Sequence, residues 1–73
     1  MNKIIKLSRL HHDNDGEVVE RTDMLFNVDS MITAEINFQL CCTSITYRGE
    51  SVKTIECLEN VETIMYLINQ KNY

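Results

Sequence analysis

Apolar and polar residues alternate most strictly between Ile32 and Leu40, in the stretch ITAEINFQL. Successive side chains of a strand point to opposite faces, so a period of two predicts a β-strand with one buried face. The polar positions of this stretch would then face the solvent. The predicted apolar face consists of Ile32, Ala34, Ile36, Phe38 and Leu40.

A shorter alternation opens the chain. Ile5 and Leu7 alternate with Lys6 and Ser8, and this pattern predicts a half-buried strand that ends at Leu10. The sequence then turns polar over residues 11–23. Turn-forming residues lie near the start of this segment, at Asn14, Asp15 and Gly16.

The polar segment leaves two alternatives open. Val18 and Val19 are suited to begin a return strand, which would make residues 11–23 part of a hairpin. A flexible loop is equally compatible with so many polar residues. Further along, ITYRGESVKTI predicts a second hairpin, in which Gly49 would adopt a positive φ at the turn.

The period changes to that of a helix in the closing stretch CLENVETIMYLINQKN. Acidic Glu59 and Glu62 near its start and basic Lys71 near its end suit the helix dipole. The stretch therefore predicts an amphipathic helix that covers one face of the sheet. Its apolar stripe consists of Leu58, Val61, Ile64, Met65 and Ile68.

These elements together predict the α+β class: a small antiparallel β-meander of four to five strands with one C-terminal helix, in a single domain over residues 1–73. A chain of 73 residues buries only about 60% of its unfolded surface, so its core is thin. Assistance from a second subunit, a metal or a disulfide is therefore expected.

Charge and composition limit the partners. The net charge is −4 and the seven Lys and Arg residues are scattered, which makes a nucleic acid an unlikely partner. No apolar run approaches the roughly 18 residues that a membrane span needs, so we expect a cytoplasmic location, the host cytoplasm if a phage encodes the chain. The three cysteines are expected to be reduced and structural, with Cys41 and Cys57 filling core volume.

The segment HHDNDGE, His11 to Glu17, is the most reactive-looking part of the chain. Aligned on Gly16, a calcium loop would place His11 and Thr22 where acidic ligands belong. A zinc site would require the neighbouring pairs His11–His12 and Cys41–Cys42 to converge, although structural zinc ligands are normally spaced by two to four residues. We expect a solvated turn, no metal, no cofactor and no catalytic residue.

Three stretches carry a resemblance to a known family: IIKLSRL, LFNVDSMI and ITYRGESVKTIECLENVETIMYLI. In order and type they are similar to the small FlbD/SwrD-like family, and similar patterns occur in small phage-encoded proteins. The resemblance implies a turn at Asn27 and Asp29, a helix start at Glu56-Cys57, and a flagellar role. Cys57 departs from the family's usual serine, and residues 11–23 are longer than its tight turn.

The sequence favours a small non-enzymatic interaction module, a homo-oligomer of the phage or prophage accessory type. Its interface would include Phe38, Leu40, Tyr66 and Leu67. One alternative is sequestration of a nucleotide-like anionic ligand at an oligomer interface, because arginine forks suit phosphate. Another is a regulator that binds a host protein or DNA. The candidate ligand-binding residues are Arg9, Arg21 and Arg48.

Overall fold

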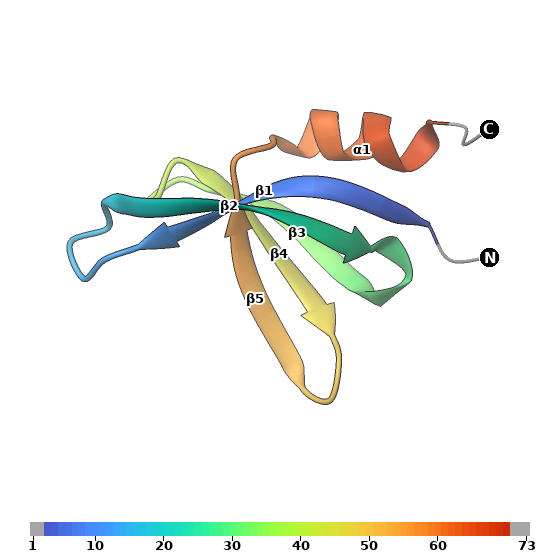
Figure 1. Cartoon of the computed structure of the whole chain (residues 1–73), viewed down its shortest axis with the longest axis horizontal. Helices are drawn as coiled ribbons and strands as arrows, with labels where there is room; N and C mark the ends of the chain where they lie inside the picture. Colours follow the sequence, from blue (N-terminus) through green and yellow to red (C-terminus); the bar gives the residue numbers. More distant parts are fainter. Residues whose placement is uncertain (1–2, 71–73) are drawn as a thin grey trace.

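The computed structural model describes residues 3–70, which form one five-stranded antiparallel sheet with a C-terminal helix (Figure 1). This confirms the predicted α+β class and the small antiparallel β-meander. Lys71 and Tyr73 lie outside the described residues. The elements are β1 (Ile4–His12), β2 (Val18–Asn27), a 3-10 turn (Val28–Ser30), β3 (Met31–Asn37), β4 (Cys42–Arg48), β5 (Val52–Cys57) and α1 (Val61–Asn69).

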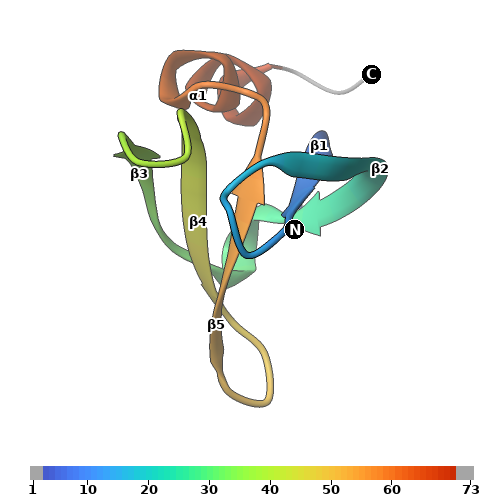
Figure 2. The same cartoon turned by 90° about the vertical axis from the view of Figure 1, so that its left-hand side faces the viewer.

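The strands lie in the order β2-β1-β5-β4-β3. Every pair of strands that is consecutive in the sequence is therefore adjacent in the sheet, except β2 and β3. These two form the edges, which lie on opposite sides of the molecule (Figure 2). The chain passes from one edge to the other through the 3-10 turn, where the Asn27 side chain accepts a hydrogen bond of 3.0 Å from the Asp29 N–H.

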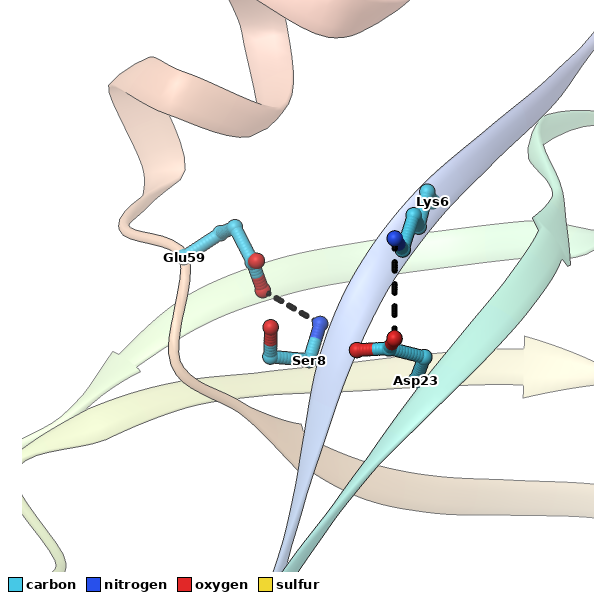
Figure 3. A network of polar contacts seen from close by, with 4 residues as sticks. All are labelled: Lys6, Ser8, Asp23 and Glu59. Atoms are coloured by element: carbon cyan, nitrogen blue, oxygen red, sulfur yellow. Dashed lines mark hydrogen bonds and ion pairs between the residues drawn. The ribbon is translucent and has the colours of Figure 1, made fainter.

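A short joint connects the β1–β2 hairpin to the rest of the sheet. Only two register pairs link β1 to β5, Arg9 with Cys57 and Leu10 with Glu56. Beyond them the Ser8 carbonyl accepts from the Leu58 N–H at 2.9 Å, and the Ser8 N–H donates to Glu59 Oε1 at 2.8 Å (Figure 3). The Glu59 carboxylate thus continues the hydrogen-bonding ladder where β5 has ended.

Residues 11–23 form a hairpin, which resolves the alternative that the sequence left open. β1 continues to His12, beyond the predicted end at Leu10, because it pairs with β2 along its whole length. Gly16 adopts a φ of 81° in the turn. Asp13 organises this turn, since its Oδ1 accepts from the N–H groups of Asp15 and Glu17 at 2.9 and 3.0 Å.

The prediction for residues 32–40 is wrong in two respects. The strand ends at Asn37, whose Oδ1 accepts from the Leu40 N–H at 3.0 Å, so residues 38–41 form a turn. The apolar face is also not buried: Ile32, Ile36 and Phe38 are 48%, 60% and 84% exposed. The physical reason is that β3 is an edge strand. It has β4 on one side only, and α1 covers only part of its apolar face.

The β4–β5 hairpin is confirmed, but its glycine was assigned the wrong conformation. Gly49 has no positive φ, because its N–H bonds to the Ser51 carbonyl at 3.1 Å in a turn that does not require one. The left-handed conformation occurs instead at Gly16 and at Cys41, whose φ is 56°. Cys41 is exposed, so the expectation that it fills core volume is also wrong.

The helix begins later than the family resemblance implies. Asn60 is the N-cap, with its Oδ1 accepting from the Thr63 N–H at 2.7 Å. Asparagine satisfies an unpaired N–H of the first turn better than a thiol does. Cys57 therefore remains in β5, where it is fully buried. The implied helix start at Glu56-Cys57 is wrong.

The core lies between the sheet and α1, which covers one face of it (Figures 1 and 2). Phe26 from β2 meets Tyr47 from β4 edge to face, with ring centroids 5.8 Å apart. None of the helices among residues 3–70 is long and apolar enough to cross a membrane. The largest fully buried side chains belong to Leu7, Ile45, Ile64 and Cys57.

Candidate interaction surface

Two adjoining hollows lie between β3 and the start of α1. The first has a volume of about 470 Å³ and the second of about 220 Å³, and Ile36 and Asn60 line both. We call the two hollows together the β3–α1 groove. Its other lining residues are Ala34, Glu35, Val61 and Glu62 in the first hollow, and Cys41, Cys42, Thr43 and Leu58 in the second.

Exposed apolar side chains border this groove. Ile36 and Leu58 line it and are 60% and 53% exposed. Ile32 lies near the start of β3 and Phe38 directly follows its end, and both are exposed. Met65 is 56% exposed and follows Val61 by four residues, which places the two on one side of α1. An apolar patch of this kind is typical of an interaction site.

The groove presents negative charge. Its charged lining residues among residues 3–70 are Glu35 and Glu62, and no lysine or arginine of this part of the chain lines it. Glu35 follows Ala34 in β3, so its side chain points to the other face of the strand, which leaves Glu62 as the charged side chain at the groove. A carboxylate there repels phosphate and other anions. The geometry therefore suits apolar, neutral or cationic groups.

The four predicted interface residues fall into two classes. Phe38 and Tyr66 are 84% and 66% exposed and are free to contact another molecule. Leu40 and Leu67 are partly buried. Leu67 packs against the core. Leu40 lies beside the first hairpin turn, since a Cβ added at Gly16 would be 3.4 Å from Leu40 Cδ2. The interface role of the four residues stays a prediction.

The three predicted ligand-binding arginines do not share one face in the strand register. Arg21 lies opposite Leu10, the neighbour of Arg9, so Arg9 and Arg21 point to opposite faces of the hairpin. Arg48 is the last residue of β4, next to the β4–β5 turn. Binding of a phosphate by any of them stays a prediction.

Cys42 and Cys57 are buried, whereas Cys41 is exposed. Burial, with a smaller effect of the Glu59 carboxylate, raises the pKa of the Cys57 thiol to about 12. Burial and then the Glu56 carboxylate also raise the pKa of Cys42. Because the thiolate is the nucleophile, both groups are poorly suited to catalysis at neutral pH. All three cysteines are free.

The segment HHDNDGE forms the end of β1 and the turn that follows. His11 Nε2 lies 3.1 Å from Thr22 Oγ1, and the Asp13 carboxylate is used by the turn backbone. Both ring nitrogens of His12 are buried without a hydrogen-bond partner among the described residues. Within residues 3–70 no three His, Cys, Asp or Glu side chains gather as metal ligands would.

Sequence reasoning missed Ile32, Ile36, Leu58 and Met65 as surface residues, because it assigned all four to buried faces. The period of two is the same for a buried strand and for an exposed edge strand, so only the strand order distinguishes them. No family model, curated protein or solved structure matches the chain.

Proposed function

We propose that the protein is a small non-enzymatic binding module that self-associates through the surface around the β3–α1 groove. The observation that carries the proposal is the exposure of Ile32 and Ile36 on the edge strand β3 and of Phe38 directly after it. Exposed apolar side chains on an unpaired edge favour association, because pairing removes both apolar surface and unpaired backbone groups from water. The small size and the high Ile and Asn content, eight and seven of 73 residues, suit a phage or prophage accessory protein.

Size-exclusion chromatography with light scattering tests the proposal. We expect the protein to be oligomeric at micromolar concentration and Ile36→Lys to shift it to the monomer. Leu25→Lys is the matched control, because Leu25 is 74% exposed on the opposite edge strand β2. A monomeric parent protein would contradict the proposal, as would equal dissociation by both variants.

The size of the groove favours a second candidate function, the binding of a small molecule. A volume of about 470 Å³ lies within the roughly 300–1,000 Å³ that is usual for ligand sites. Glu62 favours a neutral or cationic molecule over the nucleotide-like anion suggested by the sequence. Thermal-shift measurements with nucleotides and with small organic cations compare the two classes, and stabilisation by nucleotides alone would contradict this assignment.

A further inference from the structure

β3 offers an unusually unprotected edge. Within residues 3–70 it pairs with β4 alone, and its seven residues carry one charge, Glu35, and no proline. Edge strands that avoid pairing normally carry several charges, a proline or a covering loop. A bulge is another such protection, and β3 carries a register shift between Met31 and Thr33, so its regular part runs over residues 33–37. The outward N–H and C=O groups of the strand therefore remain available to another strand.

Two-fold symmetry limits how a second copy can pair with this edge. In an antiparallel pair related by a two-fold axis, the same face of both sheets points the same way, so the axis must pass beside one residue of each strand. Ala34 is the midpoint of Met31–Asn37. An axis there keeps the pairing within the strand and clear of the turn of residues 38–41, with the register shift at Ile32 on one side of the axis.

Charge decides between this axis and its neighbours. With the axis at Ala34, Thr33 faces Glu35 of the second copy, and no two carboxylates oppose each other. With the axis at Glu35, the two Glu35 side chains would lie directly opposite, which destabilises a strand pair. An axis at Ile36 would move the pairing onto the turn of residues 38–41 and shorten it.

Exposed apolar side chains also lie near the axis at Ala34. Ile36 is 60% exposed, and Ile32, at the register shift of the strand, is 48% exposed, so both would lie near the contact between the two copies. Both helices would lie on the same side of the joined sheet. The β3–α1 groove, lined by Ala34, Ile36 and Val61, would then border this contact.

We propose that two copies join through antiparallel β3–β3 pairing centred on Ala34, which makes one continuous ten-stranded sheet from the two five-stranded sheets. This inference rests on the proposed function and specifies the interface of the self-association. The occupant of the β3 edge is a second copy of this chain.

Opposite charge changes at one exposed position test the register. Thr33→Lys would place a lysine opposite Glu35 twice in each dimer, and Thr33→Glu would place a carboxylate there. We expect the dissociation constant to fall about tenfold for the lysine variant and to rise about tenfold for the glutamate variant. Thr22→Lys and Thr22→Glu on β2 are the matched controls, expected to leave dimerisation unchanged.

Equal effects of the Thr33 and Thr22 variants, or a change of the same sign for Thr33→Lys and Thr33→Glu, would overturn the register. Thermal melting of each variant confirms that the fold is kept. Disulfide cross-linking gives a second measurement in a Cys41→Ser background, which removes the exposed thiol. Ala34→Cys is expected to cross-link two copies rapidly, because directly opposite Cβ atoms lie about 5 Å apart.

The cross-linking result separates the two proposals. A protein that elutes as an oligomer, yet does not cross-link at position 34, keeps the proposed self-association and overturns the β3–β3 pairing. Rapid cross-linking of Ile36→Cys in place of Ala34→Cys would likewise overturn the axis at Ala34. A monomeric parent protein overturns both proposals, and then the edge would be left for another partner.

Discussion

The two edges of the sheet differ in how they are protected. β2 carries Glu20, Arg21 and Asp23 within its first six residues, and Asp23 forms an exposed ion pair of 3.5 Å with Lys6 on β1 (Figure 3). β3 carries only Glu35. Charges on an edge oppose pairing with another strand, whereas an apolar edge permits it. The two edges therefore differ in charge, although both expose apolar side chains: Val18, Val19 and Leu25 of β2 are 52%, 63% and 74% exposed.

The joint between the two sides gives the largest expected effect. Glu59→Ala removes the acceptor of the Ser8 N–H, which leaves a part-buried donor unpaired. We expect a loss of about 2 kcal/mol in the free energy of unfolding. Glu59→Gln retains a side-chain oxygen acceptor and is expected to lose less. Urea unfolding measures both, and an equal loss for the two variants would contradict the role of this hydrogen bond.

The Cys57 thiol of β5, in the same joint, should make the stability of the protein depend on alkaline pH. The Cys57 pKa is about 12 in the folded protein and 9.0 for the unperturbed thiol. Between these values the unfolded chain loses a proton that the folded chain keeps, so stability falls as pH rises, by about 1.4 kcal/mol per pH unit. Below about pH 9 this contribution is fully present.

Urea unfolding at a series of alkaline pH values measures this slope. Cys57→Ala has a lower stability at neutral pH because it leaves a cavity, but its stability should fall less steeply above pH 9. The same slope in both proteins would show that other groups cause the alkaline loss.

The turn of the hairpin side gives the next effect. Asp13→Ala removes the acceptor of the Asp15 and Glu17 N–H groups, and we expect a loss of about 1 kcal/mol in unfolding free energy. Asp13→Asn keeps an oxygen at this position and serves as the control. A neutral Asp13→Ala would show that the turn is held by Gly16 and by its backbone hydrogen bonds alone.

The smallest expected effect concerns the two residues in the left-handed conformation, Gly16 in the β1–β2 turn and Cys41 in the β3–β4 turn. Gly16 suits its φ of 81°, whereas Cys41 carries a Cβ at a φ of 56°. We expect Cys41→Gly to stabilise the protein by about 0.5–1 kcal/mol and Gly16→Ala to destabilise it by a similar amount. Thermal melting measures both, and destabilisation by Cys41→Gly would show that the Cys41 side chain contributes more than its strain.

Local sequence patterns predicted the elements better than they predicted their surroundings. Turn residues placed a chain reversal near Gly16, with a hairpin and a flexible loop both left open, and alternation placed the strands on either side of Gly49, because these features depend on near neighbours. The helix start was missed because the resemblance pointed to Cys57, although Asn60 is the better cap. The buried or exposed state of Ile32 and Ile36 depends on β3 being an edge, which no local pattern encodes.

The candidate surface was predicted only in part for the same reason. Phe38 was identified as a contact residue and is the most exposed large apolar side chain among the described residues. Ile36, Leu58 and Val61 come together only because β5 leads into a helix that starts beside β3. The pairing of β1 with β5 sets this arrangement.

The pairing of β1 with β5 has a consequence for the order in which the protein folds. It joins Arg9 near the start of the chain to Cys57 near its end, so the strand pairing of greatest sequence separation completes the sheet. Closing so long a loop is entropically costly, and non-local contacts slow folding. During synthesis the β1–β2 hairpin therefore emerges from the ribosome long before its partner strand, with Leu7 and Phe26 still exposed to water until β5 and α1 arrive.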